Sequence, residues 1–384
     1  MAAFSSYLAL KLGIAAWTAD GWTTTEIGVS VTLVGLSYAT LVSLGGKLAD
    51  RFGRARVSSC GVLLGALGCA LPLLIHTPLA ATATAMLSFA GCAFFFPGIA
   101  GLFSDSEASH AASATTPLHL RISQYNIGWS SGNVLGFVTA FLIGSLPDWI
   151  GYALCTAAFV VPFLILLQYI HLPPAQPASV GDRATHPDLE RLTLNGRIGL
   201  LIACLVGFSL TAELDKALSE HLLASEASRR ASFALASYSA GYCLMFILLG
   251  QWAGWVMRPR RLLWLQAGLL LGPIGMIVCG AAGLITVPWL TLVAFITGLG
   301  YGAFYNASIY YSLRLPHGAS RAAGLHETFL GVGISAGPVL CGLLMHPLRH
   351  LISHVAALGI VAAAFAAANL LYQLVMLPKA PATA

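Results

Sequence analysis

The chain has 384 residues, of which 58% are hydrophobic and 9% are charged, and its formal net charge is +5. Soluble globular domains contain about 45–50% apolar and about 25% charged residues, so this composition excludes an ordinary soluble domain and predicts a membrane protein. The basic residues flank apolar segments instead of forming one patch, which argues against nucleic acid as a partner.

Apolar segments long enough to cross a bilayer recur along the whole chain. A transmembrane helix needs about 20 mostly apolar residues, and in lipid it satisfies its own backbone. The segments are too long and too uniformly apolar for barrel strands. The sequence therefore predicts an all-α membrane protein with twelve transmembrane helices, at residues 1–19, 28–48, 57–76, 80–103, 122–146, 149–171, 197–218, 232–256, 262–284, 287–312, 322–345 and 351–377.

The distribution of basic residues between these spans predicts the orientation. With the N-terminus inside, the inner loops and ends hold fourteen Lys and Arg residues and the outer loops hold four. Positive charge concentrates on the cytoplasmic side of membrane proteins. We therefore expect both termini to be cytoplasmic. Arginine outnumbers lysine and alanine is abundant, which is typical of GC-rich bacteria and favours an inner membrane.

The loop between the second and third predicted spans concentrates charge. It reads GGKLADRFGRARV over residues 45–57. Within it, GKLADRFGRAR from Gly46 matches GQWAGWVMRPR from Gly250 at an offset of 204 residues, with Gly, Ala and two Arg positions in common. A second match aligns GNVLGF from Gly132 with GISAGP from Gly333 at an offset of 201. Two matches at nearly equal offsets indicate an internal duplication.

The longest polar break between spans, residues 172–196, is rich in Pro, Ala and charge and is interpreted as a linker. We expect an N-terminal six-helix bundle at residues 1–171, a cytoplasmic linker at 172–196 and a C-terminal six-helix bundle at 197–384. At the repeat offset, the start of the seventh span maps to a point before Met1. The first span is therefore expected to be short at its inner end.

The charged loop resembles the signature loop of the major facilitator superfamily. The residues that carry the resemblance are Gly46, Asp50, Arg51, Gly53, Arg54 and Arg56. The resemblance extends over the chain and implies a transporter of two pseudo-symmetric six-helix bundles, but leaves the cargo open. It also implies that Asp50 contacts the cytoplasmic N-terminus of the eleventh helix, where exposed N–H groups favour an anion. The arginines could equally anchor the topology or bind lipid headgroups.

Ionisable side chains inside a membrane are costly, so each is a candidate functional group. Lys11 and Asp215 occupy equivalent positions of the first and seventh spans at the 204 offset. Because the outer ends of these two helices meet in inward-open members of the superfamily, we predict that Lys11 and Asp215 form an external gate pair. The alternative is that Glu213, Lys216 and Glu220 pair with one another on a water-exposed extension of the helix.

Glu327 lies about two turns into the eleventh span if that helix is capped at Ser320. Two turns correspond to roughly 10 Å of depth, where loss of water favours a neutral carboxyl group that can carry a proton. We predict proton coupling through Glu327 or Glu213. The alternative for Glu327 is a buried acid satisfied by neighbouring hydroxyls or by the helix dipole. His326 is expected to point to another face.

Polar and aromatic residues of the fifth and tenth spans are the predicted substrate contacts, because the resemblance places both spans at the central cavity. They are Gln124, Asn126, Trp129, Asn133, Tyr301, Tyr305 and Asn306. Buried amides need partners, which are either water and substrate or neighbouring helices. No arginine lies deep in a span to bind a multiply charged anion. We therefore expect an uncharged or zwitterionic, partly aromatic or amphipathic solute.

Histidines and cysteines give no convincing metal site in the sequence. His346, His350 and His354 recur every four residues, a spacing that can bind metal on one helix face. Pro347 interrupts this turn, so we expect solvated histidines. The eight cysteines lie in apolar spans without metal-ligand spacing and are interpreted as small core residues. No cofactor is expected.

The sequence as a whole predicts a secondary active transporter that moves a small organic solute by alternating access, with proton coupling. The alternatives are a facilitated-diffusion uniporter and a non-transporting receptor or assembly factor on the same scaffold. An enzyme is not expected, because no convergent catalytic set or nucleotide-binding loop is present. Antiporters of the superfamily carry a Gly-Pro pair in the fifth helix, and Gly136-Phe137 at this position argues against drug export. The expected partners are substrate, protons and lipid, and the expected state is a monomer.

Overall fold

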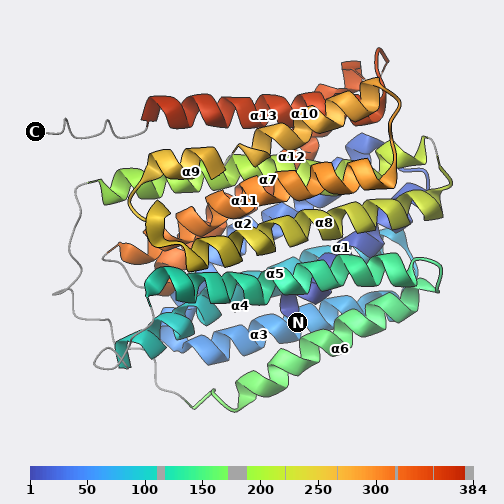
Figure 1. Ribbon diagram of the computed structural model, residues 1–384. Helices are drawn as coiled ribbons and strands as arrows, with labels where there is room; N and C mark the ends of the chain where they lie inside the picture. The colour runs from blue at the N-terminus through green and yellow to red at the C-terminus, as the bar shows by residue number, and fades with distance from the viewer. Residues whose placement is uncertain are drawn as a thin grey trace, which may run out of the picture.

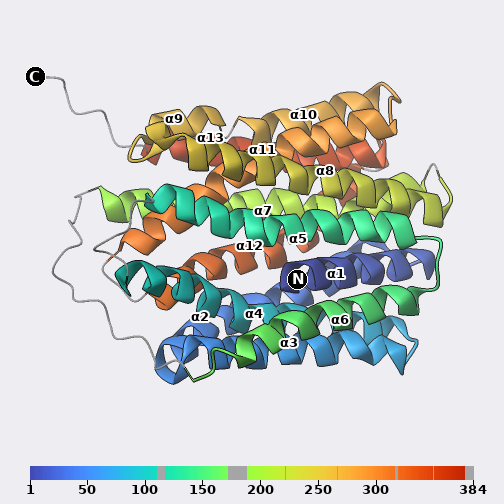
Figure 2. The same ribbon diagram turned by 60° about the horizontal axis from the view of Figure 1, so that its bottom comes forward.

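The computed structural model is a bundle of helices that run along one common direction (Figures 1 and 2). No strand occurs among the residues whose structure is described. These residues are 1–109, 117–171, 188–220, 222–265, 267–315, 319–348 and 350–376.

The helices correspond to the predicted spans in order. Ten segments of the described chain are helical, long and apolar enough to cross a membrane. The other two predicted spans, α1 and α5, carry more polar residues. The bounds are α1 (Ala2–Ala19), α2 (Thr24–Phe52), α3 (Arg54–Ala70), α4 (Pro78–Ser109), α5 (Leu118–Ile143), α6 (Asp148–Leu167), α7 (Leu189–Ser219), α8 (Ala224–Gln251), α9 (Pro259–Leu265), α10 (Gly268–Ala281), α11 (Val287–Arg314), α12 (Ala319–Leu348) and α13 (His354–Met376), with short 3-10 helices at Leu71–Leu73 and Ala253–Trp255.

The helix numbers shift by one after α8, because α9 and α10 together form the predicted ninth span. α11, α12 and α13 are therefore the tenth, eleventh and twelfth spans. The linker prediction needs a correction at its end, since α7 begins at Leu189, within residues 172–196. Leu189 and Leu192 are buried, and Asn195 accepts a hydrogen bond from Tyr372 of α13, so this turn packs as part of the bundle. Residues 172–187 lie outside the described part of the chain.

Two helix junctions show why the chain forms these elements. α2 begins with a capping box, in which Thr23 Oγ1 accepts from the Glu26 N–H and Glu26 Oε2 accepts from the Thr23 N–H. The same helix ends at Gly53, whose φ is +99°. Residues other than glycine rarely adopt this backbone conformation. The glycine lets α3 begin immediately in a new direction.

The helices α1–α6 and the helices α7–α13 pack within themselves in the same pattern. The pairs α1·α4, α1·α5, α1·α6, α2·α4, α3·α4 and α3·α6 correspond to α7·α11, α7·α12, α7·α13, α8·α11, α10·α11 and α10·α13. Between the two sets, α2 packs on α12 and α5 packs on α8. Because α2 corresponds to α8 and α5 corresponds to α12, the α2·α12 contact is the counterpart of the α5·α8 contact. This equivalence is expected for a duplicated unit.

Small residues allow the closest approach between α2 and α12. A Cβ atom added at Gly35 would lie 2.5 Å from the backbone N of Ser335, and one added at Gly331 would lie 2.7 Å from the Cα of Ala39. Thr32 Oγ1 donates to the carbonyl oxygen of Ser335 at 2.7 Å on the same seam. Helices in lipid associate through such close packing and interhelical hydrogen bonds, because lipid tails are as apolar as the side chains.

Within the sequence given, α1 covers fewer residues than its counterpart α7. α1 has 18 residues and α7 has 31. The N-terminal end of α1 lies about midway along the bundle in both views (Figures 1 and 2). The first turns of α1 are therefore at the depth of the bundle centre.

Substitution of Gly35 by Val is expected to destabilise the protein by about 1–3 kcal/mol, because the branched side chain would overlap backbone atoms of α12. Thermal unfolding of the purified protein in detergent measures the effect. Gly128→Val is the matched control, since nothing lies within 4 Å of a Cβ atom at Gly128. Equal melting temperatures of the two variants would contradict the proposed close contact.

Candidate functional site

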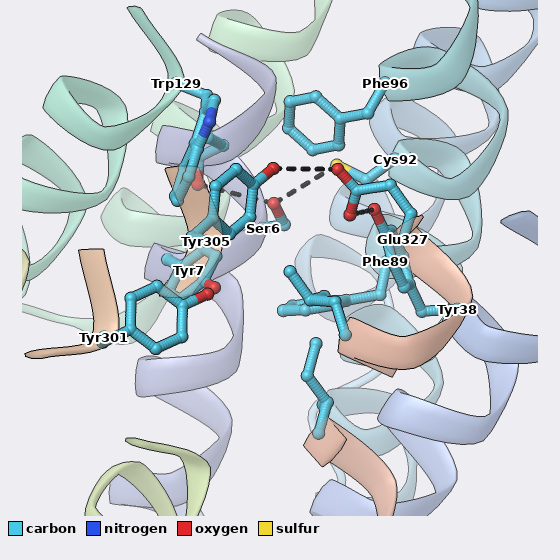
Figure 3. Close-up of a pocket in the computed structure, with 13 residues that line it drawn as sticks. Ser6, Tyr7, Tyr38, Phe89, Cys92, Phe96, Trp129, Tyr301, Tyr305 and Glu327 are labelled. Carbon is cyan, nitrogen blue, oxygen red and sulfur yellow. Dashed lines mark hydrogen bonds between the residues drawn. The ribbon is translucent and has the colours of Figure 1, made fainter. Parts of the chain in front are cut away.

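A small cavity lies between the two sets of helices and is lined by residues of α1, α2, α4, α5, α11 and α12. Its volume is about 30 Å³, which is room for about two water molecules. In Figure 3, Trp129, Tyr7, Tyr301 and Tyr305 face Phe89, Phe96 and Tyr38 across the space. These seven rings, named here the aromatic lining, make the cavity mostly apolar, with hydroxyl groups at its edge.

Glu327 of α12 is the one carboxylate among the described residues that line this cavity. Its side chain is buried, with 3% of its surface exposed. Tyr38 Oη donates to Glu327 Oε2 at 2.7 Å, and Tyr305 Oη donates to Oε1 at 2.9 Å (Figure 3). Tyr38 lies on α2, so this hydrogen bond joins the two sets of helices. Glu327 thus has hydroxyl partners, as in the alternative interpretation of a buried acid satisfied by neighbouring hydroxyls.

The expectation that His326 points to another face than Glu327 is wrong. Its Nε2 lies 3.9 Å from Glu327 Oε1, and its Nδ1 lies 2.8 Å from Ser308 Oγ. The ring also packs edge-on against Tyr305, with 4.8 Å between ring centroids. Consecutive helix positions differ by about 100°, but both side chains extend toward α11 and their ends converge there.

The predicted substrate contacts divide into two groups. Trp129, Tyr301 and Tyr305 line the cavity. Asn126 and Asn306 do not, because Asn126 Nδ2 donates to Asn306 Oδ1 at 2.9 Å and the pair joins α5 to α11. Trp129 Nε1 donates to Asn126 Oδ1 at 3.2 Å, which orients the indole ring from behind.

Asn133 and Gln124 also lie outside the cavity lining. Asn133 is buried and its Nδ2 donates to Tyr242 Oη at 2.8 Å, a bond between α5 and α8. Gln124 is exposed, so its prediction as a substrate contact is not supported by its position in this conformation. A helix of about 3.6 residues per turn turns residues 124 and 126 to different faces. The buried amides thus bond to neighbouring helices.

Sequence reasoning missed Tyr7, Tyr38, Phe89 and Phe96. All four lie in apolar spans, Phe89 and Phe96 on the same one, and aromatic side chains in such spans usually pack in the core. The hydroxyl groups of Tyr7 and Tyr38 in otherwise apolar segments are the signal that could have identified them, because a buried hydroxyl needs a partner.

The pair predicted from the repeat is present in the structure. Lys11 Nζ lies 2.6 Å from Asp215 Oδ1 and donates to Ser228 Oγ at 2.8 Å. The exposed fractions of Lys11 and Asp215 are 1% and 0%. The ion pair therefore joins α1 to α7 and α8 in a site shielded from solvent. Its role as an external gate remains a prediction.

Glu213 and Glu220 lie beside His354 of α13. His354 Nε2 is 3.5 Å from Glu213 Oε2, and its Nδ1 is 3.1 Å from Glu220 Oε1. Glu213 and His354 are buried, whereas Glu220 is 44% exposed. The expectation that His354 is solvated is therefore wrong, because the carboxylates of α7 hold its ring in the bundle. No group of three possible metal ligands occurs in the described part of the chain.

The charged loop forms a compact cluster at one end of the bundle. A Cβ atom added at Gly46 would lie 2.6 Å from the carbonyl oxygen of Ser320, at the start of α12. Asp50 lies one turn farther along the same face of α2, and its Oδ1 is 3.4 Å from Arg54 Nη2. Arg54 is buried and its Nη1 also donates to the carbonyl oxygen of Gly101. The contact of Asp50 with the α12 N-terminus remains a prediction.

The other two arginines of the loop make contacts near the surface. Arg56 Nε donates to the carbonyl oxygen of Ile170 at 2.9 Å. The guanidinium of Arg51 lies 5.2 Å from the ring centroid of Phe52. These contacts neither require nor exclude the lipid-binding role that the sequence left open.

Close contacts between the two sets of helices lie toward both ends of the bundle. At the end that carries the charged loop, α2 packs on α12 at Gly46 and α5 packs on α8 at Ser123 and Gly250. Toward the other end, Lys11 binds Asp215 and Gly28 packs on the backbone of Pro338. At about 30 Å³, the cavity itself has no room for a solute of more than a few atoms in this conformation.

Three comparisons with known proteins agree on the kind of protein. The sequence profile of the family described as Major Facilitator Superfamily matches residues 1–338. Uncharacterized MFS-type transporters from two strains of Mycobacterium tuberculosis are 26% identical over 200 residues, which is 52% of this chain. The match spans 43% of the length of these curated relatives.

Two solved structures are similar over nearly the whole chain. The nucleoside transporter NupG has a TM-score of 0.65 at 14% identity and 98% coverage of each chain. The transporter FucP, solved in the outward conformation, has a TM-score of 0.60 at 12% identity, with coverage of 98% of this chain and 99% of that one. At such identities the likeness shows the fold alone.

Removal of either partner of the buried ion pair is expected to destabilise the protein by about 3 kcal/mol or more, because the remaining charge stays buried without a counter-ion. Lys11→Met and Asp215→Asn test this in thermal unfolding. The exchange Lys11→Asp with Asp215→Lys is expected to recover part of the loss. Lys216→Met serves as the control on the same helix. A double exchange no more stable than either single exchange would count against the pair.

Proposed function

The chain belongs to the major facilitator superfamily, and from this premise we propose that it is a secondary active transporter that moves a small organic solute by alternating access, coupled to protons at Glu327. The fold and the family make it a membrane transporter. The observation that carries the finer proposal is the place of Glu327. It is a buried carboxylate in the wall of a cavity that helices of both sets line together.

Protonation of Glu327 would change the contact between the two halves. The ionised carboxylate accepts hydrogen bonds from Tyr38 and from Tyr305 at once. A protonated carboxyl group carries an O–H donor on one oxygen and is a weaker acceptor. The Tyr38–Glu327 bond between α2 and α12 therefore depends on the protonation state. Glu213 is the weaker candidate for this role, because it lies beside His354 and does not line the cavity.

The two ends supply separate gates in this proposal. Lys11 and Asp215 hold the outer end closed, and Asp50 with Gly46 holds the inner end closed. The halves, residues 1–171 and the segment from α7 onward, would rock about the cavity between these gates. Breaking a buried ion pair is costly, so opening the outer end requires either water entry or a compensating gain at the inner end.

The charge distribution supports a proposal for the placement in the membrane. We propose that the chain is a monomer in a bacterial inner membrane. Both termini would be cytoplasmic, because the arginine-rich loops lie at the end of the bundle that carries residues 46–56. No catalytic activity is proposed, and no cofactor or nucleic acid is required. The solute, protons and lipid are the partners that the proposal needs.

Cysteine labelling from each side of the membrane tests the proposal and requires no identified solute. The reporters are Thr24→Cys at the outer end of α2 and Ser123→Cys at the inner end of α5, both buried positions. They are placed one at a time in a variant without native cysteines, in vesicles of either orientation. Because the reactive thiolate fraction falls with pH, labelling is expressed relative to the same cysteine in the denatured protein at each pH. On this scale, a change from about pH 8 to about pH 5 is expected to raise labelling of one reporter and lower that of the other.

Glu327→Gln is expected to abolish this pH response, because glutamine cannot exchange a proton. Glu226→Gln is the matched control, since Glu226 is a surface acid paired with Arg229 and Arg230. A pH response that survives in Glu327→Gln removes Glu327 as the coupling group. Labelling that shifts with solute but never with pH indicates a uniporter. Labelling fixed under all conditions indicates a non-transporting scaffold.

Asp50→Asn is expected to weaken the inner gate. The amide keeps the shape of the side chain but loses the negative charge near the start of α12 and the pairing with Arg54. Labelling of Ser123→Cys should rise several-fold while thermal stability changes by less than about 1 kcal/mol. Unchanged labelling of Ser123→Cys would argue that Asp50 only anchors the loop.

A further inference from the structure

The charged side chains that line the cavity indicate which class of solute it could bind. The inference about the solute rests on the proposed transport function. Of the described residues that line the cavity, none is Lys or Arg, and Glu327 is the one with a formal charge. The buried Lys11 is already bound to Asp215 and Ser228. No ion pair joins Glu327 to a Lys or Arg in the described part of the chain. An ionised Glu327 thus has two hydroxyls and the neighbouring His326 as its polar surroundings.

The hydrogen bonds of Glu327 leave room for a further donor. A carboxylate has about four acceptor sites on its two oxygens. Tyr305 occupies one on Oε1 and Tyr38 occupies one on Oε2. A positively charged group in the cavity could therefore bind the carboxylate while both tyrosines stay in place. It would also supply the counter-charge that no Lys or Arg provides.

The aromatic lining supplies a second kind of attraction for a positive charge. Trp129 and Tyr305 lie 4.7 Å apart between ring centroids, and Tyr301 lies 6.1 Å from Tyr305. Tyr38 and Phe89 form a further pair at 6.2 Å on the other side of the cavity (Figure 3). Ring faces attract a cation within about 6 Å, and the attraction is strongest where water is excluded. The same faces repel an anion and provide apolar contact for the body of a solute.

We propose that the transported solute is an organic monocation with an aromatic or alkyl body, whose charged group binds between Glu327 and the aromatic lining. This differs from the uncharged or zwitterionic solute expected from the sequence, because the structure places a carboxylate among the cavity aromatics without a basic partner for a solute anion. The proposal concerns the charge of the solute and leaves the direction of transport open.

A proton and the solute then compete for one site. Binding of the cation to a protonated Glu327 releases that proton, so that the carboxyl group, the proton and the cation balance in charge. Affinity is expected to rise with pH as Glu327 loses its proton. Other titratable groups near enough to feel its charge lie on several helices. They are Tyr7, Tyr38, Cys92, Tyr125, Cys204, Tyr305 and His326.

Of these neighbours, His326 is the one whose ordinary titration range falls between about pH 5 and pH 8. His326→Gln therefore separates its contribution from that of Glu327. The pH dependence of cation binding is expected to survive in His326→Gln and to disappear in Glu327→Gln.

Binding of matched probes to the purified full-length protein tests the proposal. Tetraphenylphosphonium and tetraphenylborate have nearly the same shape and opposite charge, and 2-phenylethylammonium, 2-phenylethanol and phenylacetate form a smaller series. Binding is measured by the change in tryptophan fluorescence, with Trp129→Phe to locate the signal. We expect at least one cation to bind about tenfold or more tightly than its anionic and neutral analogues, since a desolvated charge pair and ring faces both favour it.

Glu327→Gln is expected to lower cation affinity about tenfold or more and to abolish proton release into a weakly buffered solution. Glu226→Gln should bind like the wild type. Tyr38→Phe is a second test that does not depend on the folding of Glu327→Gln. It keeps the carboxylate and frees one of its acceptor sites, so it should retain cation binding. Equal binding of anions or neutral analogues, unchanged affinity in Glu327→Gln, or failure of both cations to bind the wild type overturns the proposal.

The same probes distinguish this inference from the proposed function. If a neutral or anionic probe binds and shifts the labelling of Thr24→Cys and Ser123→Cys, the chain is a transporter and the solute class is wrong. If a cation binds at Glu327 while labelling stays fixed on both sides, the solute class stands and alternating access is wrong.

Discussion

Lipid cannot solvate a charge or accept a hydrogen bond, and this constraint governs where polar groups lie in the protein. Lys11 and Asp215 are buried together because neither could stay charged alone. Asn126 and Asn306 bond across the interface for the same reason. The polar side chains therefore tie helices from different parts of the sequence to one another. Glu327 differs from Asp215, which has Lys11 as its counter-ion. The groups around Glu327 are the hydroxyls of Tyr38 and Tyr305 and the imidazole of His326.

The interface between the halves combines close packing of small residues with individual hydrogen bonds. Its seam along α2 and α12 consists of small residues in close contact, which provide packing without deep interlocking of long side chains. Among the described residues, Tyr38–Glu327 and Thr32–Ser335 are hydrogen bonds across this seam, and Lys11–Asp215, Asn126–Asn306 and Asn133–Tyr242 join the halves elsewhere. The hydrogen bonds of the seam can be exchanged for bonds to water or solute at little net cost, whereas a large apolar interface could not be.

The site shows where sequence reasoning succeeds and where it stops. Lys11 and Asp215 could be paired in advance, because the repeat places them at equivalent positions of helices that meet on the axis. Helical spacing put Tyr301 and Tyr305 on one face of the tenth span, and the family resemblance put that span and Trp129 of the fifth span at the cavity, which all three line. Gln124 lies outside the cavity lining in this conformation and Tyr38 was missed, because the sequence does not state how far each helix is rotated about its own axis. A rotation of one residue, about 100°, decides whether a side chain faces lipid or the cavity.

The sequence by itself determined the membrane environment, the order of the apolar spans and the duplication, since these depend on composition, segment length and internal similarity. It also identified the charged loop from Gly46 to Arg56. Only the tertiary structure decided that Glu327 lies among aromatic rings, and that the buried His354 lies beside Glu213 and Glu220. Those contacts join residues far apart in the chain, and they depend on the packing of helices that a single sequence does not specify.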